Sequence, residues 1–110
     1  MGGFVKGDVV VVPFPFSDLT NSKKRPAFVC ADLDGDDLIL AQITSQSTYD
    51  NYAVLIQDDD FQEGSLRKTS NVRTNKIFTA DQEIVLYKIG CLNRGKIEEI
   101  THSIIGILST

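Results

Sequence analysis

The segment DVVVVPFPF, residues 8–16, does most to set the fold class of this 110-residue chain. Valine is β-branched and packs well on a pleated surface, so four in succession predict a buried strand. The alternating proline and phenylalanine predict an edge or a bend at its end, because proline cannot donate to a strand ladder. This segment therefore favours a β-rich fold.

Short apolar segments separated by turn-forming residues extend this pattern along the chain. Strands are expected over residues 26–33, 38–45, 52–57, 70–79 and 83–89. We expect Gly90 to end the last strand, loops over residues 17–24 and 58–68, and a hairpin turn over residues 34–36, where Gly35 can take a positive φ.

The C-terminal segment changes to a helical period. One apolar face of an amphipathic helix is predicted by Ile97, Ile100, Ile104, Ile107 and Leu108. Asn93 is the expected N-cap, and His102 falls on the opposite, solvent-facing side. Several short strands followed by one helix predict a mainly β fold, a small twisted barrel closed by that helix, with residues 1–110 as a single domain.

The composition is that of an ordinary globular protein, with 42% hydrophobic and 24% charged residues. No apolar run approaches the roughly 20 residues of a membrane span, so we expect no membrane partner. Cys30 and Cys91 both lie in apolar segments, which favours reduced core thiols and a cytoplasmic location.

The charge is unevenly distributed. The net charge is −4, yet seven of the eleven basic residues fall in two short segments. We name them basic cluster 1 (Lys23, Lys24 and Arg25) and basic cluster 2 (Arg67, Lys68, Arg73 and Lys76). Such polarisation predicts an anion site on one face of an acidic protein, unless exposed loops simply collect charge.

Several chemistries are disfavoured by what the sequence lacks. The only histidine is His102, so neither a Cys/His metal site nor a histidine-dependent nucleophile is expected. There is no glycine-rich phosphate loop and no dinucleotide fingerprint, so we expect no cofactor and no metal. The remaining Arg, Lys, Thr, Ser and Asn side chains suit phosphate recognition, including RNA cleavage by the internal 2′-OH.

Four segments in order resemble the MazF/PemK/Kid toxins, which are endoribonucleases of bacterial toxin–antitoxin pairs. They are GDVVVVPFPFSDLTNSKKRPAFV (residues 7–29), LILAQITSQ (38–46), SNVRTNKIFT (70–79) and the isoleucine helix. The resemblance covers nearly the whole chain. It implies an SH3-like barrel with a terminal helix, a homodimer, and metal-independent cleavage of single-stranded RNA to 2′,3′-cyclic phosphate and 5′-hydroxyl ends. It also implies a cognate antitoxin with an acidic tail, and DNA binding together with that antitoxin.

The resemblance implies catalytic roles for Arg25 in Lys-Arg-Pro, Thr44 in Ile-Thr-Ser and Arg73 in Val-Arg-Thr. Arg25 would stabilise the scissile phosphate, Thr44 would hydrogen-bond a phosphate oxygen or help move the proton, and Arg73 would add positive charge. Substrate contacts are expected from Asp18, Thr20, Lys23, Lys24, Ser45, Gln46, Arg67, Lys68, Ser70, Asn75 and Lys76.

The chain departs from the family pattern where a carboxylate base would stand. Asn75 and Thr20 occupy the two positions, and an amide cannot abstract a proton. Asp18 is a reserve candidate for a base, or else a turn-capping residue. Phe14 and Phe16 either stack on a base or belong to the core.

Two alternatives to an enzyme remain open. A non-catalytic barrel could bind RNA or an acidic peptide, which the missing carboxylate favours. A gyrase poison on the same fold is the other alternative, although that family uses a tryptophan near its C-terminus and this chain has none.

Overall fold

The computed structural model describes residues 3–14, 23–46 and 50–110. In chain order its strands are β1 (Asp8–Phe14), β2 (Lys23–Asp32), β3 (Asp37–Thr44), β4 (Ala53–Ile56), β5 (Phe61–Glu63), β6 (Ser70–Asp81) and β7 (Tyr87–Leu92). Two short 3-10 helices are η1 (Asp58–Asp60) and η2 (Gln82–Ile84), and the α-helix α1 (Arg94–Leu108) comes last.

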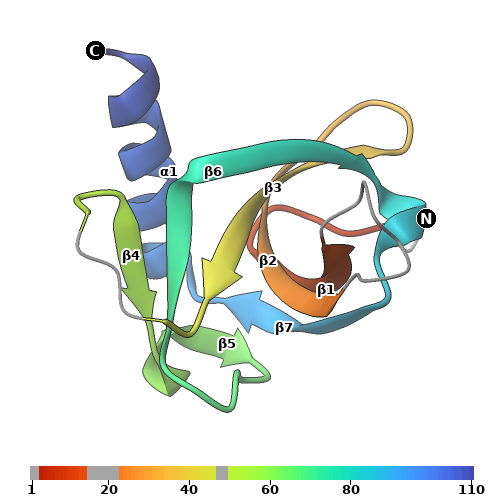
Figure 1. Ribbon diagram of the computed structural model, residues 1–110, viewed down its shortest axis with the longest axis horizontal. Coiled ribbons are helices and arrows are strands. Elements are labelled where there is room, and N and C mark those ends of the chain that lie inside the picture. The colour runs from red at the N-terminus through yellow and green to blue at the C-terminus, as the bar shows by residue number, and fades with distance from the viewer. Residues whose placement is uncertain (1–2, 15–22, 47–49) are drawn as a thin grey trace.

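The strands form one antiparallel sheet in the order β4-β6-β3-β2-β1-β7-β5. The sheet curls on itself into a half-barrel, and α1 lies beside β4 and β6 (Figure 1). This confirms the predicted mainly β architecture with a terminal helix. The two outermost strands, β4 and β5, are also the shortest, with four and three residues.

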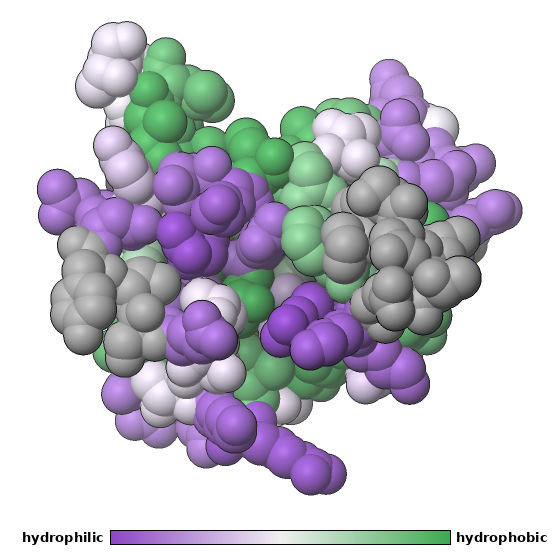
Figure 2. Space-filling view, in the orientation of Figure 1, coloured by the Kyte–Doolittle hydropathy of each residue, from purple (hydrophilic) through white to green (hydrophobic). Residues whose placement is uncertain are grey.

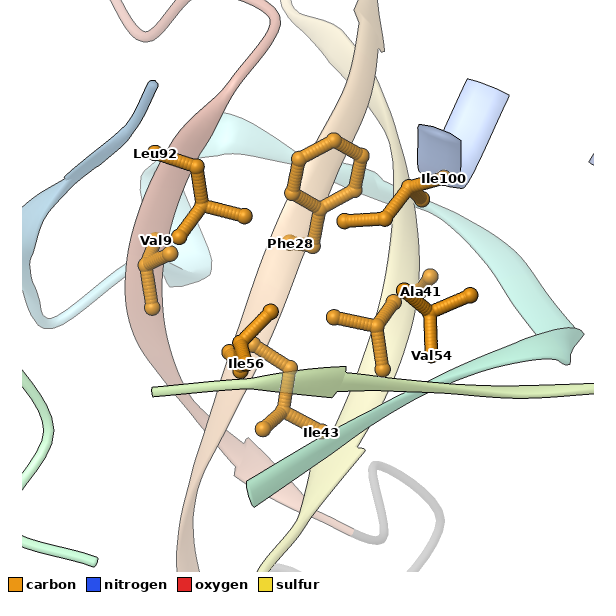
Figure 3. Close-up of a cluster of buried hydrophobic side chains, with 9 residues drawn as sticks. Val9, Phe28, Ala41, Ile43, Val54, Ile56, Leu92 and Ile100 are labelled. Carbon is orange, nitrogen blue, oxygen red and sulfur yellow. The ribbon is translucent and has the colours of Figure 1, made fainter. Parts of the chain in front are cut away.

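Most of β1 and the middle of β2 and β3 are buried on both faces, which explains the continuous valine run in β1. Their side chains belong to two apolar clusters, one on each face of the sheet, because successive residues of a strand point to opposite faces. One cluster, shown in Figure 3, includes Val9, Phe28 and Ile100 from α1. The other contains Val10, Val12, Ala27, Val29, Leu38 and Leu40.

The helix begins where the sequence predicts. The Asn93 side chain accepts a hydrogen bond from the Lys96 amide at 2.9 Å, which confirms the N-cap. Ile100 is fully buried, and Ile97 and Ile104 pack against the same cluster. The expected apolar face does not extend to Leu108, which is 72% exposed, because the end of α1 projects past the sheet (Figure 1).

Four predicted boundaries were wrong. The strand expected to begin at residue 83 begins at Tyr87, because Gln82–Ile84 form η2. The second strand starts at Lys23, so basic cluster 1 lies in β2 and not in a loop. The segment 58–68 contains η1 and β5. Gly90 is buried inside β7 and does not end it.

Gly90 lies inside β7, and does not end it, for a steric reason. A Cβ at Gly90 would lie 2.1 Å from the Glu63 carbonyl oxygen and 2.9 Å from the Gly64 Cα. The glycine therefore permits close approach of β7 to the end of β5.

Strand β6 turns a corner at residues 73–76. On β3, Ala41 pairs with Ile77 and Ile43 pairs with Val72, so four residues of β6 face the single residue Gln42. Such an excess bends a strand and increases its twist. Before the corner, β6 also pairs with β4 through residues 70–73, and at the corner Tyr52 O accepts both the Thr74 amide at 3.1 Å and the Thr74 hydroxyl at 2.6 Å.

In the part of the chain that the structure describes, no helix combines the length and the apolarity needed to cross a bilayer.

Candidate functional site

The candidate site lies where one face of the sheet changes from apolar to polar. The second apolar cluster includes Ala27 of β2 and Leu40 of β3. Because side chains alternate, the same face continues through Arg25 on β2 and through Gln42 and Thr44 on β3. The sheet thus forms an apolar floor that ends in polar side chains.

Two clefts open at this end of the face. Cleft A, of about 300 Å³, is lined by Val12, Phe14, Arg25, Pro26, Ala27, Gln42, Ile43, Thr44, Gln46, Arg73, Lys76 and Phe78. Cleft B, of about 280 Å³, is lined by Arg25, Pro26, Ile43, Thr44, Ser45, Leu66, Arg67, Lys68 and Ser70. Figure 2 looks onto this side of the molecule, where hydrophilic side chains surround a hydrophobic recess near the centre of the view.

Arg25 and Thr44 lie on the boundary between the clefts, since both residues line cleft A and cleft B. Ala27 pairs with Gln42 across β2 and β3. This is the last pair between the two strands, and Arg25 and Thr44 each lie two residues beyond it, on the same face of the sheet. A group bound at this boundary can therefore contact both side chains.

The Thr44 hydroxyl is oriented by the backbone two residues further along the chain. Its Oγ1 accepts a hydrogen bond from the Gln46 amide at 3.1 Å. A hydroxyl carries one donor in addition to its lone pairs, so the Thr44 proton is available to a ligand oxygen.

The clefts are electropositive although the protein is acidic. Five basic residues line them, and among the described lining residues there is no aspartate or glutamate. Arg25, Arg73 and Lys76 line cleft A, and Arg67 and Lys68 line cleft B with Arg25. Arg25 of basic cluster 1 and the four residues of basic cluster 2, far apart in the sequence, thus line adjoining clefts and form a site suited to an anion.

Arg73 is the most constrained of these cations. Its Nη2 donates to Asp50 Oδ2 at 2.9 Å, and its side chain is only 20% exposed. Its Nε is buried and has no hydrogen-bond partner among the described residues. Asp50, three residues before the start of β4, was not among the residues predicted from the sequence.

The structure separates the remaining predicted residues into three groups. Gln46, Lys76, Ser45, Arg67, Lys68 and Ser70 line one of the clefts. Lys23, Lys24 and Asn75 are exposed and line neither cleft. Asp18, Thr20 and Phe16 lie outside the described residues.

Two of these residues have defined local environments. The Ser70 hydroxyl donates to the Lys68 carbonyl at 3.0 Å and is buried, so it braces the wall of cleft B. Phe14 forms a tilted ring pair with Phe78, 6.1 Å between centroids, within the apolar lining of cleft A. Phe78 and Gln42 were missed from the sequence, although the alternation of β3 places Gln42 on the same face as Thr44.

Within residues 3–14, 23–46 and 50–110, no group of three or more His, Cys, Asp or Glu side chains is arranged to hold a metal ion. His102 is exposed on α1, as the helical period predicts.

The curled antiparallel sheet with its terminal helix defines the chain as a small half-barrel with basic clefts. Residues 5–108 match the family described as "PemK-like, MazF-like toxin of type II toxin-antitoxin system", and the chain belongs to this family. No curated protein matches the chain.

Solved structures share the fold at low sequence identity. A mycobacterial endoribonuclease in complex with its cognate antitoxin has a TM-score of 0.75 at 13% identity, covering 99% of this chain and 96% of its own. A MazF from Deinococcus radiodurans has a TM-score of 0.72 at 14% identity, covering 100% of both chains. The Mycobacterium tuberculosis toxin MazF-mt6 has a TM-score of 0.69 at 14% identity, covering 91% and 96%.

Proposed function

We propose that the protein is an RNA-cleaving toxin whose reaction takes place between cleft A and cleft B. The observation that carries this proposal is the pair Arg25 and Thr44 at the boundary of two clefts lined by five basic side chains and no described carboxylate. A single-stranded RNA that follows both clefts has its scissile phosphate at this boundary.

The chemistry uses the nucleophile within the RNA. The ribose 2′-oxygen attacks the adjacent phosphorus, the bond from phosphorus to the 5′-oxygen breaks, and a 2′,3′-cyclic phosphate and a 5′-hydroxyl result. The 2′-OH proton leaves to solvent water, and the 5′-oxygen takes one from solvent. Positioning and charge stabilisation then provide the catalysis, which a fixed guanidinium beside a hydroxyl can supply.

Each cleft residue has a role in this proposal. Arg25 binds the two non-bridging phosphate oxygens through its planar fork, Thr44 donates its hydroxyl proton to one of them, and Arg73 adds charge from cleft A. Arg67 and Lys68 in cleft B, with Lys76 in cleft A, follow the RNA backbone. No metal ion is assigned to the reaction.

The partner follows from membership in a toxin–antitoxin family. We propose a cognate antitoxin whose acidic, partly disordered tail occupies the basic clefts, and DNA binding by the resulting complex. Exposed apolar side chains on β4 and α1, Leu55, Ile105 and Leu108, support a homodimer. Cytoplasmic action completes the proposal.

RNA cleavage by the purified protein tests the activity. A mixed-sequence RNA is incubated with and without EDTA, and the product ends are mapped. We expect cleavage in both conditions, cyclic phosphate ends, and no cleavage where the nucleotide 5′ to the cut is 2′-deoxy. Loss of cleavage in EDTA would contradict the metal-free mechanism, and RNA binding without scission would select a non-catalytic RNA-binding barrel.

The oligomeric state is tested separately. Light scattering coupled to gel filtration should give twice the 12.1 kDa chain mass. The double variant I105K/L108K should give a monomer, and a wild-type monomer would contradict the dimer proposal alone.

A further inference from the structure

Asp50 forms a short ion pair with a cleft-lining arginine. Its Oδ2 accepts from Arg73 Nη2 at 2.9 Å, and the two side chains are 32% and 20% exposed. A charge-assisted hydrogen bond of this length is among the stronger side-chain contacts, and partial burial reduces its screening by salt.

The Asp50 carboxylate is itself fixed. Its Oδ1 accepts the Tyr52 backbone amide at 3.0 Å, an interaction that closes a local turn just before β4. The Tyr52 carbonyl in turn accepts the Thr74 amide and hydroxyl at 3.1 and 2.6 Å. Asp50 is thus anchored to the same corner of β6 that carries Arg73.

The ion pair determines which Arg73 donors remain for a ligand. A guanidinium has five N–H groups. The buried Nε has no described partner, and one Nη2 hydrogen is directed at Asp50. Three Nη hydrogens are left, and the Asp50 contact limits the orientations in which they can enter cleft A.

We propose that Asp50 is a positioning residue for Arg73, an inference that rests on the proposed RNA cleavage. Asp50 lines neither cleft, and each carboxylate oxygen already accepts a hydrogen bond. It therefore acts through Arg73, fixing that guanidinium for the phosphate, and does not replace the carboxylate base that is missing at Asn75.

The variant Asp50→Asn isolates the ion pair. The asparagine oxygen can still accept the Tyr52 amide, whereas its NH₂ group faces the Arg73 donor and cannot accept from it. Asp81→Asn is the matched control, because Asp81 Oδ1 accepts the Glu83 amide at 2.8 Å with the same two-residue spacing and Asp81 lines neither cleft.

The readout is steady-state cleavage of a short RNA, with kcat and KM measured separately. Misplacing a charged group by about 1 Å costs up to about 100-fold in rate, so we expect D50N to lower kcat about 10- to 100-fold and to change KM less than about threefold. D81N should behave as the wild type. In an Arg73→Ala background, D50N should have no further effect on kcat.

The outcomes are distinguishable. A D50N kcat equal to that of D81N, or a full additional loss in the Arg73→Ala background, would overturn the positioning role. A lower KM with kcat unchanged or raised would overturn it too, because Asp50 would then compete with RNA for Arg73.

Two further controls complete the design. Thermal unfolding establishes that each variant is folded. If D50N does not fold, Asp50→Ser, whose hydroxyl also accepts the Tyr52 amide, is held to the same criteria. No cleavage by the wild type would overturn the proposed function and this inference together, whereas wild-type cleavage with a fully active D50N would overturn the inference alone.

Discussion

The close contact between Gly90 and the end of β5 makes a sharp prediction about stability. In Gly90→Ala the new Cβ would lie 2.1 Å from the Glu63 carbonyl oxygen, 2.9 Å from the Glu63 carbonyl carbon and 2.9 Å from the Gly64 Cα. All three atoms are backbone, so no side chain can rotate away. Ordinary contact begins at 3.4 Å, and β5 must therefore move away from β7.

The magnitude follows from two costs. Overpacking costs about 1–3 kcal/mol, and a lost strand hydrogen bond adds about 1 kcal/mol. We expect Gly90→Ala to lower the free energy of unfolding by about 3 kcal/mol, which for 110 residues is a fall in Tm of about 13 °C.

Urea unfolding followed by circular dichroism, with thermal melts alongside, measures this change. Gly106→Ala in α1 is the control, since a Cβ there meets nothing within 4 Å and alanine favours a helix interior by up to about 1 kcal/mol over glycine. A loss of less than about 1 kcal/mol for Gly90→Ala would refute the steric argument, as would equal effects of the two substitutions.

Three further predictions follow from the clefts and the core. Thr44→Val keeps the shape but removes the hydroxyl, so kcat for RNA cleavage should fall by about 10²-fold or more, as for other lost transition-state donors. Tm should fall only by the small amount that the exposed hydrogen bond from the Gln46 amide contributes, and a fully active variant would remove Thr44 from the mechanism. Lys76→Gln should weaken RNA binding at low salt, and it should reduce the slope of the logarithm of the binding constant against the logarithm of the salt concentration by about 0.7. Fluorescence anisotropy measures this slope, and an unchanged slope would exclude a phosphate contact of Lys76. Burial raises the pKa of the Cys30 thiol to about 12, so the thiol is not ionised in the folded protein at pH 8. In a Cys91→Ser variant at this pH, iodoacetamide should label Cys30 only when the protein unfolds. Rapid labelling of the native protein would contradict this expectation.

The sequence predicted the architecture well because hydrophobic periodicity reports burial directly. The valine run of β1 and the isoleucine face of α1 each correspond to an observed element. Boundaries were less predictable, and Gly90 explains why. A glycine that allows two backbones to approach has the same local signature as a glycine that ends a strand, and only the distant Glu63 distinguishes them.

The candidate site was predictable where it depends on residue type and resemblance. Arg25, Thr44 and Arg73 all line cleft A. Asp50 was not predictable, because its contact with Arg73 spans 23 positions and depends on the corner of β6. Local sequence gives no sign of that corner, which arises from a register shift between two strands.

The short outer strands of the sheet affect how readily the protein aggregates when its local concentration is high. A sheet edge offers unpaired amide and carbonyl groups to any neighbouring chain, and long flat edges seed polymers. With only four residues in β4 and three in β5, each rim offers a passing chain very few backbone groups to pair with. The fold can therefore leave its sheet unclosed, a half-barrel open enough to have clefts, with little risk of growing into a fibre.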